Sequence, residues 1–204
     1  MADKNLYRLL EQPFVYRLSQ LLLAPGAEKR VAEKLRLLKS ELDIKGTILD
    51  VGCGPQSWLT KIGVNPVGLD ISYQYSAAYN ASGTPAITGS ATALPFADHS
   101  LDSIWCIGVL HHLSDAPAQM AAQEMLRVCR LGGQVVIMDA VLPVKTWHRP
   151  LASLIRSLDR GKFMRSQKQL QDLLPGPQNW KINRYTYAAT GLEMLECIYQ
   201  KPVR

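Results

Sequence analysis

The chain has 204 residues, of which 47% are hydrophobic and 20% charged, and its net charge is +6. This length favours one domain around one core, and the apolar runs are too short or too interrupted by charge to span a bilayer. The start lacks a signal-peptide pattern, so we expect a cytoplasmic protein. Four single cysteines without zinc or redox spacing are expected to be reduced and to pack as small apolar residues: Cys53, Cys106, Cys129 and Cys197.

The sequence pattern over residues 1–45 predicts helices. Apolar side chains from Leu6 to Leu22 recur at helical spacing, Pro13 interrupts the pattern and Pro25-Gly26 ends it. A third helix follows, with one apolar face made by Val31, Leu35, Leu38 and Leu42. We expect these helices to form a cap or packing layer over the rest of the chain. Their aromatic and basic residues leave peripheral membrane contact as an alternative that we do not predict.

From residue 47 apolar strands alternate with helices, which favours a parallel sheet with right-handed crossovers. The predicted strands are 47–51, 67–71, 86–88, 103–108 and 134–139, and the predicted helices are 56–63, 73–82 and 116–130. After Pro143 the pattern predicts helices over 146–158 and 166–174, the second capped by Ser166. Residues 180–188 and 192–201 then predict an antiparallel hairpin that completes the sheet.

The first predicted strand ends in a glycine turn, Asp50-Val51-Gly52-Cys53-Gly54, and the second delivers Asp70. Two glycines let the backbone turn sharply and approach a ligand closely, and an acid after the second strand suits the hydroxyls of a ribose. The turn also approximates the dinucleotide fingerprint, with Ser57 in place of its third glycine. However, the Asp50 carboxylate would repel a pyrophosphate, whereas it suits a cationic ligand.

Four further groups of residues extend the pattern in order: Gly68-Leu69-Asp70, Ala93 to Ile104, Val109-Leu110-His111-His112-Leu113, and Glu124 to Gly133. With the glycine turn, they make the chain resemble the class I, Rossmann-like S-adenosylmethionine-dependent methyltransferases, and among these the small-molecule "type 11" group. The resemblance covers about residues 45–142. Three positions depart from the family pattern: Ser57, Ser90, where an aspartate often contacts adenine, and Leu131, where proline is usual.

The resemblance implies an α/β fold, with a doubly wound Rossmann-like sheet of seven mostly parallel strands, an antiparallel last strand and an N-terminal helical extension. It further implies a single domain over residues 1–204. Within it, residues 46–142 would form the S-adenosylmethionine-binding core, and residues 143–204 the substrate-side helices and the closing hairpin.

The resemblance also implies roles for the strand-end residues. Gly52, Cys53 and Gly54 would lie against the methionine moiety, with Asp50 near its positive charges. Asp70 would accept hydrogen bonds from both ribose hydroxyls, and Ile71 would rest on the adenine. The remaining cofactor contacts would come from Ser90 and Ala91 at the polar edge of the adenine and from the Gly108 carbonyl at the ammonium.

Such an enzyme needs no metal, because the methyl group of S-adenosylmethionine is already activated and the protein mainly aligns the acceptor. S-adenosylhomocysteine would be the product. If the acceptor is a hydroxyl or an acidic carbon, a general base helps, and the candidates are His112, at the position more often histidine in the family, and His111. The alternative for both is a structural role in the loop.

The acceptor is expected to be a small molecule, methylated at oxygen, carbon or nitrogen. Aromatic and apolar residues expected at the pocket suit an apolar or aromatic acceptor: Phe14, Tyr16, Trp147, Phe163, Met164, Tyr185 and Tyr187. A basic cluster would suit an acidic acceptor or be an exposed helix face: Arg156, Arg160, Lys162, Arg165 and Lys168. Nucleic acid is not favoured, since no aromatic and basic interleaving accompanies the cluster.

Two alternatives stay open at this point. One is an NAD(P)-dependent oxidoreductase, which the glycine turn permits and Asp50 disfavours. The other is a non-catalytic module that binds a nucleoside or a partner, which Ser57 and Ser90 motivate. The acceptor atom and the oligomeric state are not encoded in any pattern of the sequence.

Overall fold

The computed structural model of the chain describes residues 26–144, 149–157 and 161–203. The two helices expected before Pro25 lie outside these residues. So do Phe14, Tyr16, Trp147 and Arg160, and the start of the helix expected from residue 146.

The described chain forms one seven-stranded sheet in the order β3-β2-β1-β4-β5-β7-β6. The strands are β1 (Ile48–Val51), β2 (Val67–Asp70), β3 (Ala86–Thr88), β4 (Leu101–Ile107), β5 (Cys129–Val141), β6 (Lys181–Thr186) and β7 (Glu193–Gln200). Strands β3, β2, β1, β4 and β5 pair in parallel, and β7 runs antiparallel to both of its neighbours. The expected α/β fold, with its antiparallel last strand, is confirmed.

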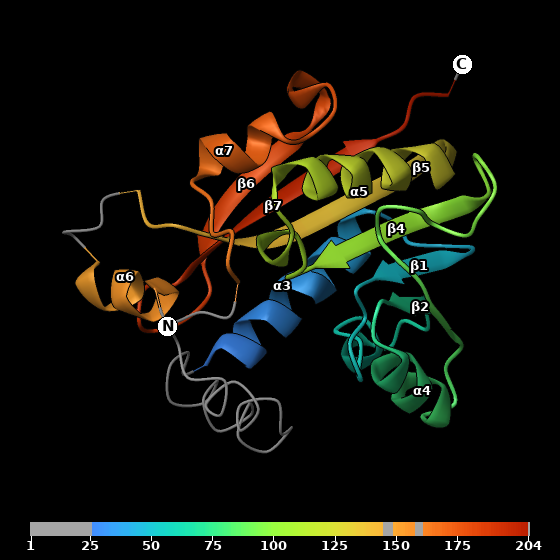
Figure 1. Cartoon of the computed structure of the whole chain (residues 1–204), viewed down its shortest axis with the longest axis horizontal. Helices are drawn as coiled ribbons and strands as arrows, with labels where there is room; N and C mark the ends of the chain where they lie inside the picture. The colour runs from blue at the N-terminus through green and yellow to red at the C-terminus, as the bar shows by residue number, and fades with distance from the viewer. Residues whose placement is uncertain (1–25, 145–148, 158–160, 204) are drawn as a thin grey trace.

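Helices cover both faces of the sheet (Figure 1). Helix α3 (Ala27–Glu41) packs on one face with side chains of β4, β5 and β7, including Trp105, Met138 and Ile198. Helices α5 (Asp115–Val128) and α7 (Gln167–Asp172) pack on the other face over the inner residues of β1, β4 and β5. The remaining helices are α4 (Tyr73–Ala81), next to β2 and β3, and α6 (Pro150–Ser157).

The amphipathic helix expected after Gly26 is confirmed as α3. Its apolar side chains Val31, Leu35 and Leu38 are buried against the sheet. On the same side, Lys34 reaches the β7 carboxylate of Glu196, with 2.9 Å between Nζ and Oε2. Apolar packing and one ion pair therefore hold α3 against strands β4, β5 and β7.

The helix predicted over 56–63 is wrong. Only a single 3-10 turn, η1 (Thr60–Ile62), forms there. The Ser57 hydroxyl instead accepts a hydrogen bond from the Leu59 amide (3.0 Å). A short polar side chain that binds nearby backbone competes with helix formation, which explains the difference.

Several boundaries near Cys129 also differ from the prediction. Helix α5 ends at Val128 because Cys129 is already extended and pairs with Leu101, so β4 and β5 both begin earlier than expected. The closing hairpin and the Ser166 cap are confirmed. Ser166 and Gln169 form a reciprocal capping box, and Gly191 has a φ of 85° in the hairpin turn.

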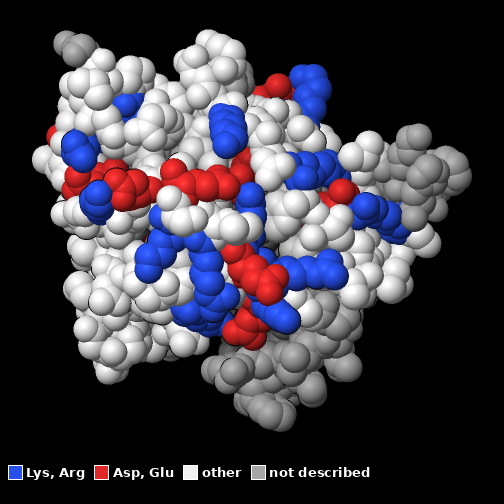
Figure 2. Space-filling view, turned by 180° about the vertical axis from the view of Figure 1, so that it is seen from behind, with Lys and Arg blue, Asp and Glu red and all other residues white. Residues whose placement is uncertain are grey.

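Among the described residues, no helix has the length and apolar character needed to cross a bilayer. All four cysteines are buried with free thiols, as expected. On the face seen in Figure 2, Lys and Arg side chains are interleaved with Asp and Glu side chains. Lys61 and Glu28 form one surface ion pair of the protein (2.7 Å).

Candidate active site

The glycine turn joins the ends of two neighbouring strands. Gly52 and Gly54 have φ values of 75° and 62°, which side chains rarely allow. A Cβ atom at Gly52 would lie 2.3 Å from the Val109 side chain, so the turn after β1 packs directly against the residues that follow β4. At Gly54, by contrast, no described atom lies within 4 Å of such a Cβ, which leaves room for a ligand against the backbone.

Asp70 ties the end of β2 to the glycine turn. Its Oδ2 accepts a hydrogen bond from the Gly54 amide (3.0 Å), and its Oδ1 accepts one from the Ser72 amide (2.8 Å). The residue is 9% exposed, whereas the next residue, Ile71, is 77% exposed. A carboxylate oxygen can accept more than one hydrogen bond, so this fixed carboxylate can also bind hydroxyl groups, beside an apolar surface suited to a base.

Ser57, one of the three departures from the family pattern, has a clear role. Its hydroxyl donates a hydrogen bond to the buried Asp50 carboxylate. Burial raises the pKa of Asp50 from 3.8 to about 6, the Ser57 hydrogen bond lowers it in part, and the negative charge of Asp70 raises it further. Asp50 is therefore an oriented acid behind the glycine turn whose charge changes near neutral pH. Beside it, burial raises the pKa of Cys53 to about 12, which keeps the thiol neutral.

The other expected cofactor residues lie at the same edge of the sheet. The Ser90 hydroxyl contacts the Thr92 hydroxyl (2.8 Å) and accepts a hydrogen bond from the Thr92 amide (3.2 Å), and Ala91 packs against the core. Gly108 directly follows β4 with a φ of 71°, and its amide donates to the Met138 carbonyl (2.8 Å). The carboxyl ends of β1, β2, β3 and β4 thus bring these residues to one edge, where ligands bind in sheets of this kind.

His111 is held by a carboxylate from β5. It lies in the 3-10 turn η2 (Leu110–His112), and its backbone amide donates to Asp139 Oδ2 (2.9 Å), while its ring Nδ1 contacts Asp139 Oδ1. Burial alone would raise the pKa of the Asp139 carboxyl. The nearby His111 ring, together with hydrogen bonds from that ring and from the Ala140 and His111 amides, instead brings the pKa below 3.8.

His112 is placed differently from His111. It is exposed, and its ring lies 4.1 Å from the His111 ring between centroids. Of the two histidines proposed as bases, His111 is the one that the structure orients through Asp139. Asp139 was missed as a functional residue, although a carboxylate within the apolar run from Val135 to Val141 is a signal that could have identified it.

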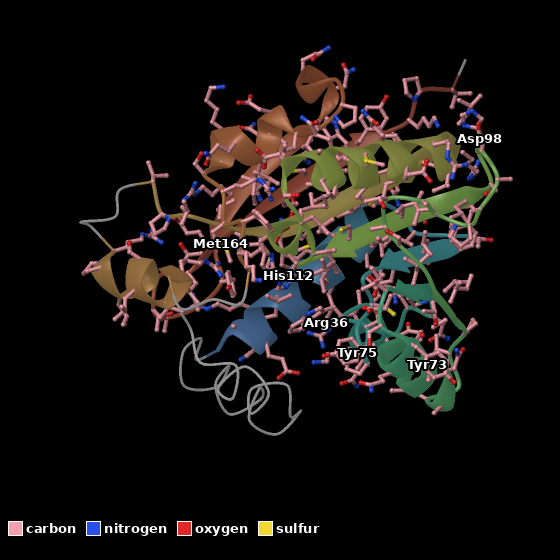
Figure 3. The ribbon with its side chains drawn as sticks, in the orientation of Figure 1. Arg36, Tyr73, Tyr75, Asp98, His112 and Met164 are labelled. Carbon is pink, nitrogen blue, oxygen red and sulfur yellow. The ribbon has the colours of Figure 1, made fainter. Side chains whose placement is uncertain are left out.

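Residues 161–165, here called the cover segment, pack over η2. A Cβ atom at Gly161 would lie 2.1 Å from His111 Cδ2, and the Phe163 amide donates to the His111 carbonyl (3.0 Å). Figure 3 labels Met164 of this segment and His112 of η2. The cover segment therefore packs against His111, and the role of Phe163 and Met164 at an acceptor pocket stays a prediction.

Arg165 anchors the cover segment and is only 5% exposed. Its guanidinium donates to the carbonyls of Leu110 (2.8 Å) and Leu113 (2.7 Å) and pairs with Asp115 at the start of α5 (2.8 Å). The interpretation of the basic cluster as an exposed helix face is thus wrong for this residue. Buried carbonyl groups need donors, and the sequence pattern gives no sign of that need.

Arg156 of the basic cluster and Tyr185, which was expected at the pocket, make other contacts. Arg156 is also buried, and it donates to the Tyr187 hydroxyl (3.1 Å) and to the Glu193 carbonyl (2.9 Å). Tyr185 packs with the core beneath α3, on the face of the sheet opposite to α5, and its hydroxyl contacts the Met194 sulfur (3.2 Å). Tyr185, predicted at the acceptor pocket, thus lies on the face of the sheet that α3 covers.

Comparison with known proteins agrees with this geometry. Residues 49–137 match a family model described as a methyltransferase domain. This matched segment is similar to methyltransferase domains. It includes the glycine turn, Asp70, Gly108 and both histidines.

Curated relatives of this chain include a 2-methyl-6-phytyl-1,4-hydroquinone methyltransferase of Synechocystis sp., 32% identical over 52% of this chain and 37% of that protein. A probable tRNA methyltransferase 9B of Homo sapiens is 34% identical over 50% of this chain and 23% of its own length. The chain thus spans well under half of these relatives. A crystal structure from Thermotoga maritima, described as a methyltransferase and possible histamine N-methyltransferase, covers 95% of this chain and 100% of that one, with a TM-score of 0.68 and 14% identity.

The cofactor of such a domain is S-adenosylmethionine. The described residues fit it, because the open backbone at Gly54, the fixed Asp70 carboxylate and the exposed Ile71 lie together at the edge of the sheet. When bound, the cofactor supplies an activated methyl group on a positively charged sulfur. The nicotinamide alternative is not favoured by these comparisons.

Proposed function

We propose that this protein is an S-adenosylmethionine-dependent methyltransferase that acts on a small-molecule acceptor at oxygen, carbon or nitrogen, in the cytoplasm. The observation that carries the proposal is the Asp70 carboxylate, fixed by the Gly54 and Ser72 amides between the open glycine turn and the exposed Ile71. In the proposed division of the chain, residues 46–142 bind the cofactor and residues 143–204 shape the acceptor side under a cap from residues 1–45.

In this proposal each strand end has one task. Gly52, Cys53 and Gly54 hold the methionine moiety, with the charge of Asp50 behind them. Asp70 binds the ribose hydroxyls and Ile71 covers the adenine. The polar edge of the adenine meets Ser90 and Ala91, and the Gly108 carbonyl accepts from the ammonium group.

A small-molecule acceptor is supported by the cover segment, which closes over η2, and by the relative named for a hydroquinone. Nucleic acid is less well supported. On the face shown in Figure 2, acidic side chains interrupt the basic ones, whereas a nucleic-acid surface needs clustered positive charge. Because one relative is named for tRNA, bulk tRNA belongs among the acceptors to be assayed.

The test is titration calorimetry with S-adenosylmethionine and S-adenosylhomocysteine. Replacing Asp70 by Ala should weaken binding by about 1.5 to 3 kcal/mol, the range for hydrogen bonds to a charged group. Asp172→Ala is the matched control, since this exposed aspartate on α7 forms a surface ion pair with Lys168 and should leave binding unchanged when it is replaced. Tight binding of NADH with no heat from either sulfur nucleoside would overturn the proposal.

A further inference from the structure

We infer that Asp139 and His111 form a proton-accepting pair, and that the methylated group is therefore one that must lose a proton, namely a hydroxyl or an acidic carbon. This inference rests on the proposed function and narrows its acceptor class. His111 would be the catalytic base, and Asp139 a positioning residue that acts through it. The argument starts from the way the two side chains meet.

One carboxylate holds His111 at two points. Asp139 Oδ2 accepts from the His111 backbone amide and Oδ1 contacts Nδ1 of the ring, so both the position of the residue and the rotation of its ring are fixed. A carboxylate at Nδ1 selects the tautomer with the proton on Nδ1, and that tautomer carries its lone pair on Nε2. A histidine with only a structural role could be held by one backbone contact.

The pair is also shielded from water. The Asp139 side chain is 2% exposed and the His111 side chain 12% exposed, and Gly161 of the cover segment packs against the ring. A glycine is required there, since a Cβ atom would overlap the ring. In a dry surrounding the carboxylate stabilises the imidazolium that forms when His111 takes a proton, which makes the ring a stronger base at the moment of transfer.

Among the described residues, the following charged and titratable groups lie near the pair. Buried thiols of Cys106 on β4 and Cys197 on β7 lie near Asp139, and burial raises the pKa of both well above the ordinary value, so they stay neutral. The Arg165 guanidinium binds carbonyls on either side of the histidines and is paired with Asp115. His112 adds a second imidazole beside His111. Among these groups, Asp139 is the anion in direct contact with the His111 ring.

The location suits methyl transfer. Val109, two residues before His111, touches the glycine turn, so η2 starts at the edge of the proposed cofactor site. In the reaction, the acceptor oxygen or carbon forms a bond to the methyl carbon while the carbon–sulfur bond breaks and leaves its electron pair on sulfur. The acceptor proton passes to Nε2 of His111. Positive charge is lost at sulfur and gained at the imidazole, so the total is unchanged.

The need for a base separates acceptor classes. A neutral hydroxyl or carbon acid is a poor nucleophile until its proton leaves, and an oriented base contributes about 10²- to 10⁴-fold to such reactions. A thiol is already partly ionised near neutral pH, and a neutral amine attacks through its own lone pair. A buried Asp–His pair therefore points to the first class.

The first experiment compares four acceptor probes of similar size with labelled S-adenosylmethionine: phenol, acetylacetone, thiophenol and aniline. We expect labelled product from phenol or acetylacetone, and a loss of about 10²-fold or more in kcat for His111→Gln. Calorimetry of S-adenosylhomocysteine runs in parallel. If the nucleoside does not bind, the proposed function itself has failed. If it binds, but only thiophenol or aniline is methylated or no probe is, the inference about the acceptor is overturned.

The second experiment isolates Asp139. In Asp139→Asn the amide NH₂ faces Nδ1 of His111, which favours the tautomer with the proton on Nε2 and removes its ability to accept one. We expect the ¹⁵N resonances of the ring to change tautomer, kcat to fall at least tenfold, and the pH dependence of kcat to change, with binding of S-adenosylhomocysteine unchanged. A lower stability with the wild-type pH profile and tautomer would show a structural role only.

Glu196→Gln is the matched control for that variant. Glu196 is a buried carboxylate on β7 like Asp139 on β5, but it lies on the α3 face of the sheet and pairs with Lys34. It should lower stability without altering the pH profile of kcat. An equal change in both variants would contradict a specific role for Asp139.

Discussion

At the scale of single residues, Asp50 has the most direct consequence, because its pKa lies near 6 in the folded protein. The folded state binds this proton more tightly than the unfolded chain does. The stabilising contribution of the protonated form is therefore complete below about pH 4 and is lost as the pH rises through 6. At neutral pH the carboxylate is charged at a cost in stability, which a nearby cation would offset.

The raised pKa of Asp50 gives a prediction for the binding of the cofactor product. The affinity for S-adenosylhomocysteine, whose ammonium group is cationic, should increase on the order of tenfold between pH 5 and pH 7 as Asp50 ionises. Calorimetry at several pH values measures this increase. In Asp50→Asn, which keeps the size and removes the charge, the affinity should be lower and flat over that range. The same rise in the variant would assign the effect to another group.

The residue scale also shows what the sequence could and could not predict. Asp50, Gly52, Gly54 and Asp70 could be placed together because they border strands in a fixed local pattern. Asp139 could not, since it meets His111 only after β5 pairs with β4, and the two residues are 28 positions apart. Ser57 was identified as a departure, but its contact with Asp50 depends on a turn that replaces the expected helix.

At the scale of elements, the cover segment depends on one buried side chain. Arg165 holds the carbonyls of Leu110 and Leu113 and thereby fixes the loop that contains both histidines. Its position far along the chain from these carbonyls explains why the basic cluster was interpreted as a site for an acidic acceptor or as an exposed helix face, and not as an anchor. A run of charges in a sequence does not show which members have buried partners.

Replacing Arg165 by Met should lower the free energy of unfolding by about 2 to 4 kcal/mol, because two carbonyls lose their donors in a buried place. Urea unfolding followed by circular dichroism measures the change. Lys168→Met is the control, since Lys168 is exposed on α7 and its pair with Asp172 is a surface pair worth little. Equal stabilities for the two variants would show that the anchoring contacts of Arg165 contribute nothing.

Strands and long helices were predictable as elements because the apolar periods of two and of about three and a half residues are distinct. The ends of these strands and helices were less predictable. Val128 and Cys129 are both apolar and buried, and only pairing of Cys129 with Leu101 decides that the helix has ended. The closing hairpin was located by its turn residues, Ala189 to Gly191, which need no distant partner.

At the scale of the whole molecule, the ion pair of Lys34 and Glu196 links helix α3 to strand β7, which lies next to the edge strand β6. The Glu196 side chain is 3% exposed and that of Lys34 is 19% exposed. Removing Lys34 should therefore lower the free energy of unfolding more than removing Glu196. Without Lys34 a buried carboxylate loses its partner, whereas without Glu196 the lysine can still reach water.

We expect Lys34→Met to lower the free energy of unfolding by about 3 kcal/mol and Glu196→Met to lower it by less, while the double variant recovers most of the loss. A double-mutant cycle by urea unfolding gives these values. Additive losses in the double variant would mean that the two charges do not interact in the folded protein.

The strand order has one last consequence, at the edge formed by β6. An open strand edge can pair with another chain and begin aggregation, and proteins limit this with charged side chains on the edge. Here β6 carries Lys181 and Arg184, and Lys181 and Asn183 are exposed, whereas the more apolar β7 is enclosed between β5 and β6. Among the described residues, the less hydrophobic strand of the hairpin thus forms the edge of the sheet, and its charges disfavour edge-to-edge pairing with another chain.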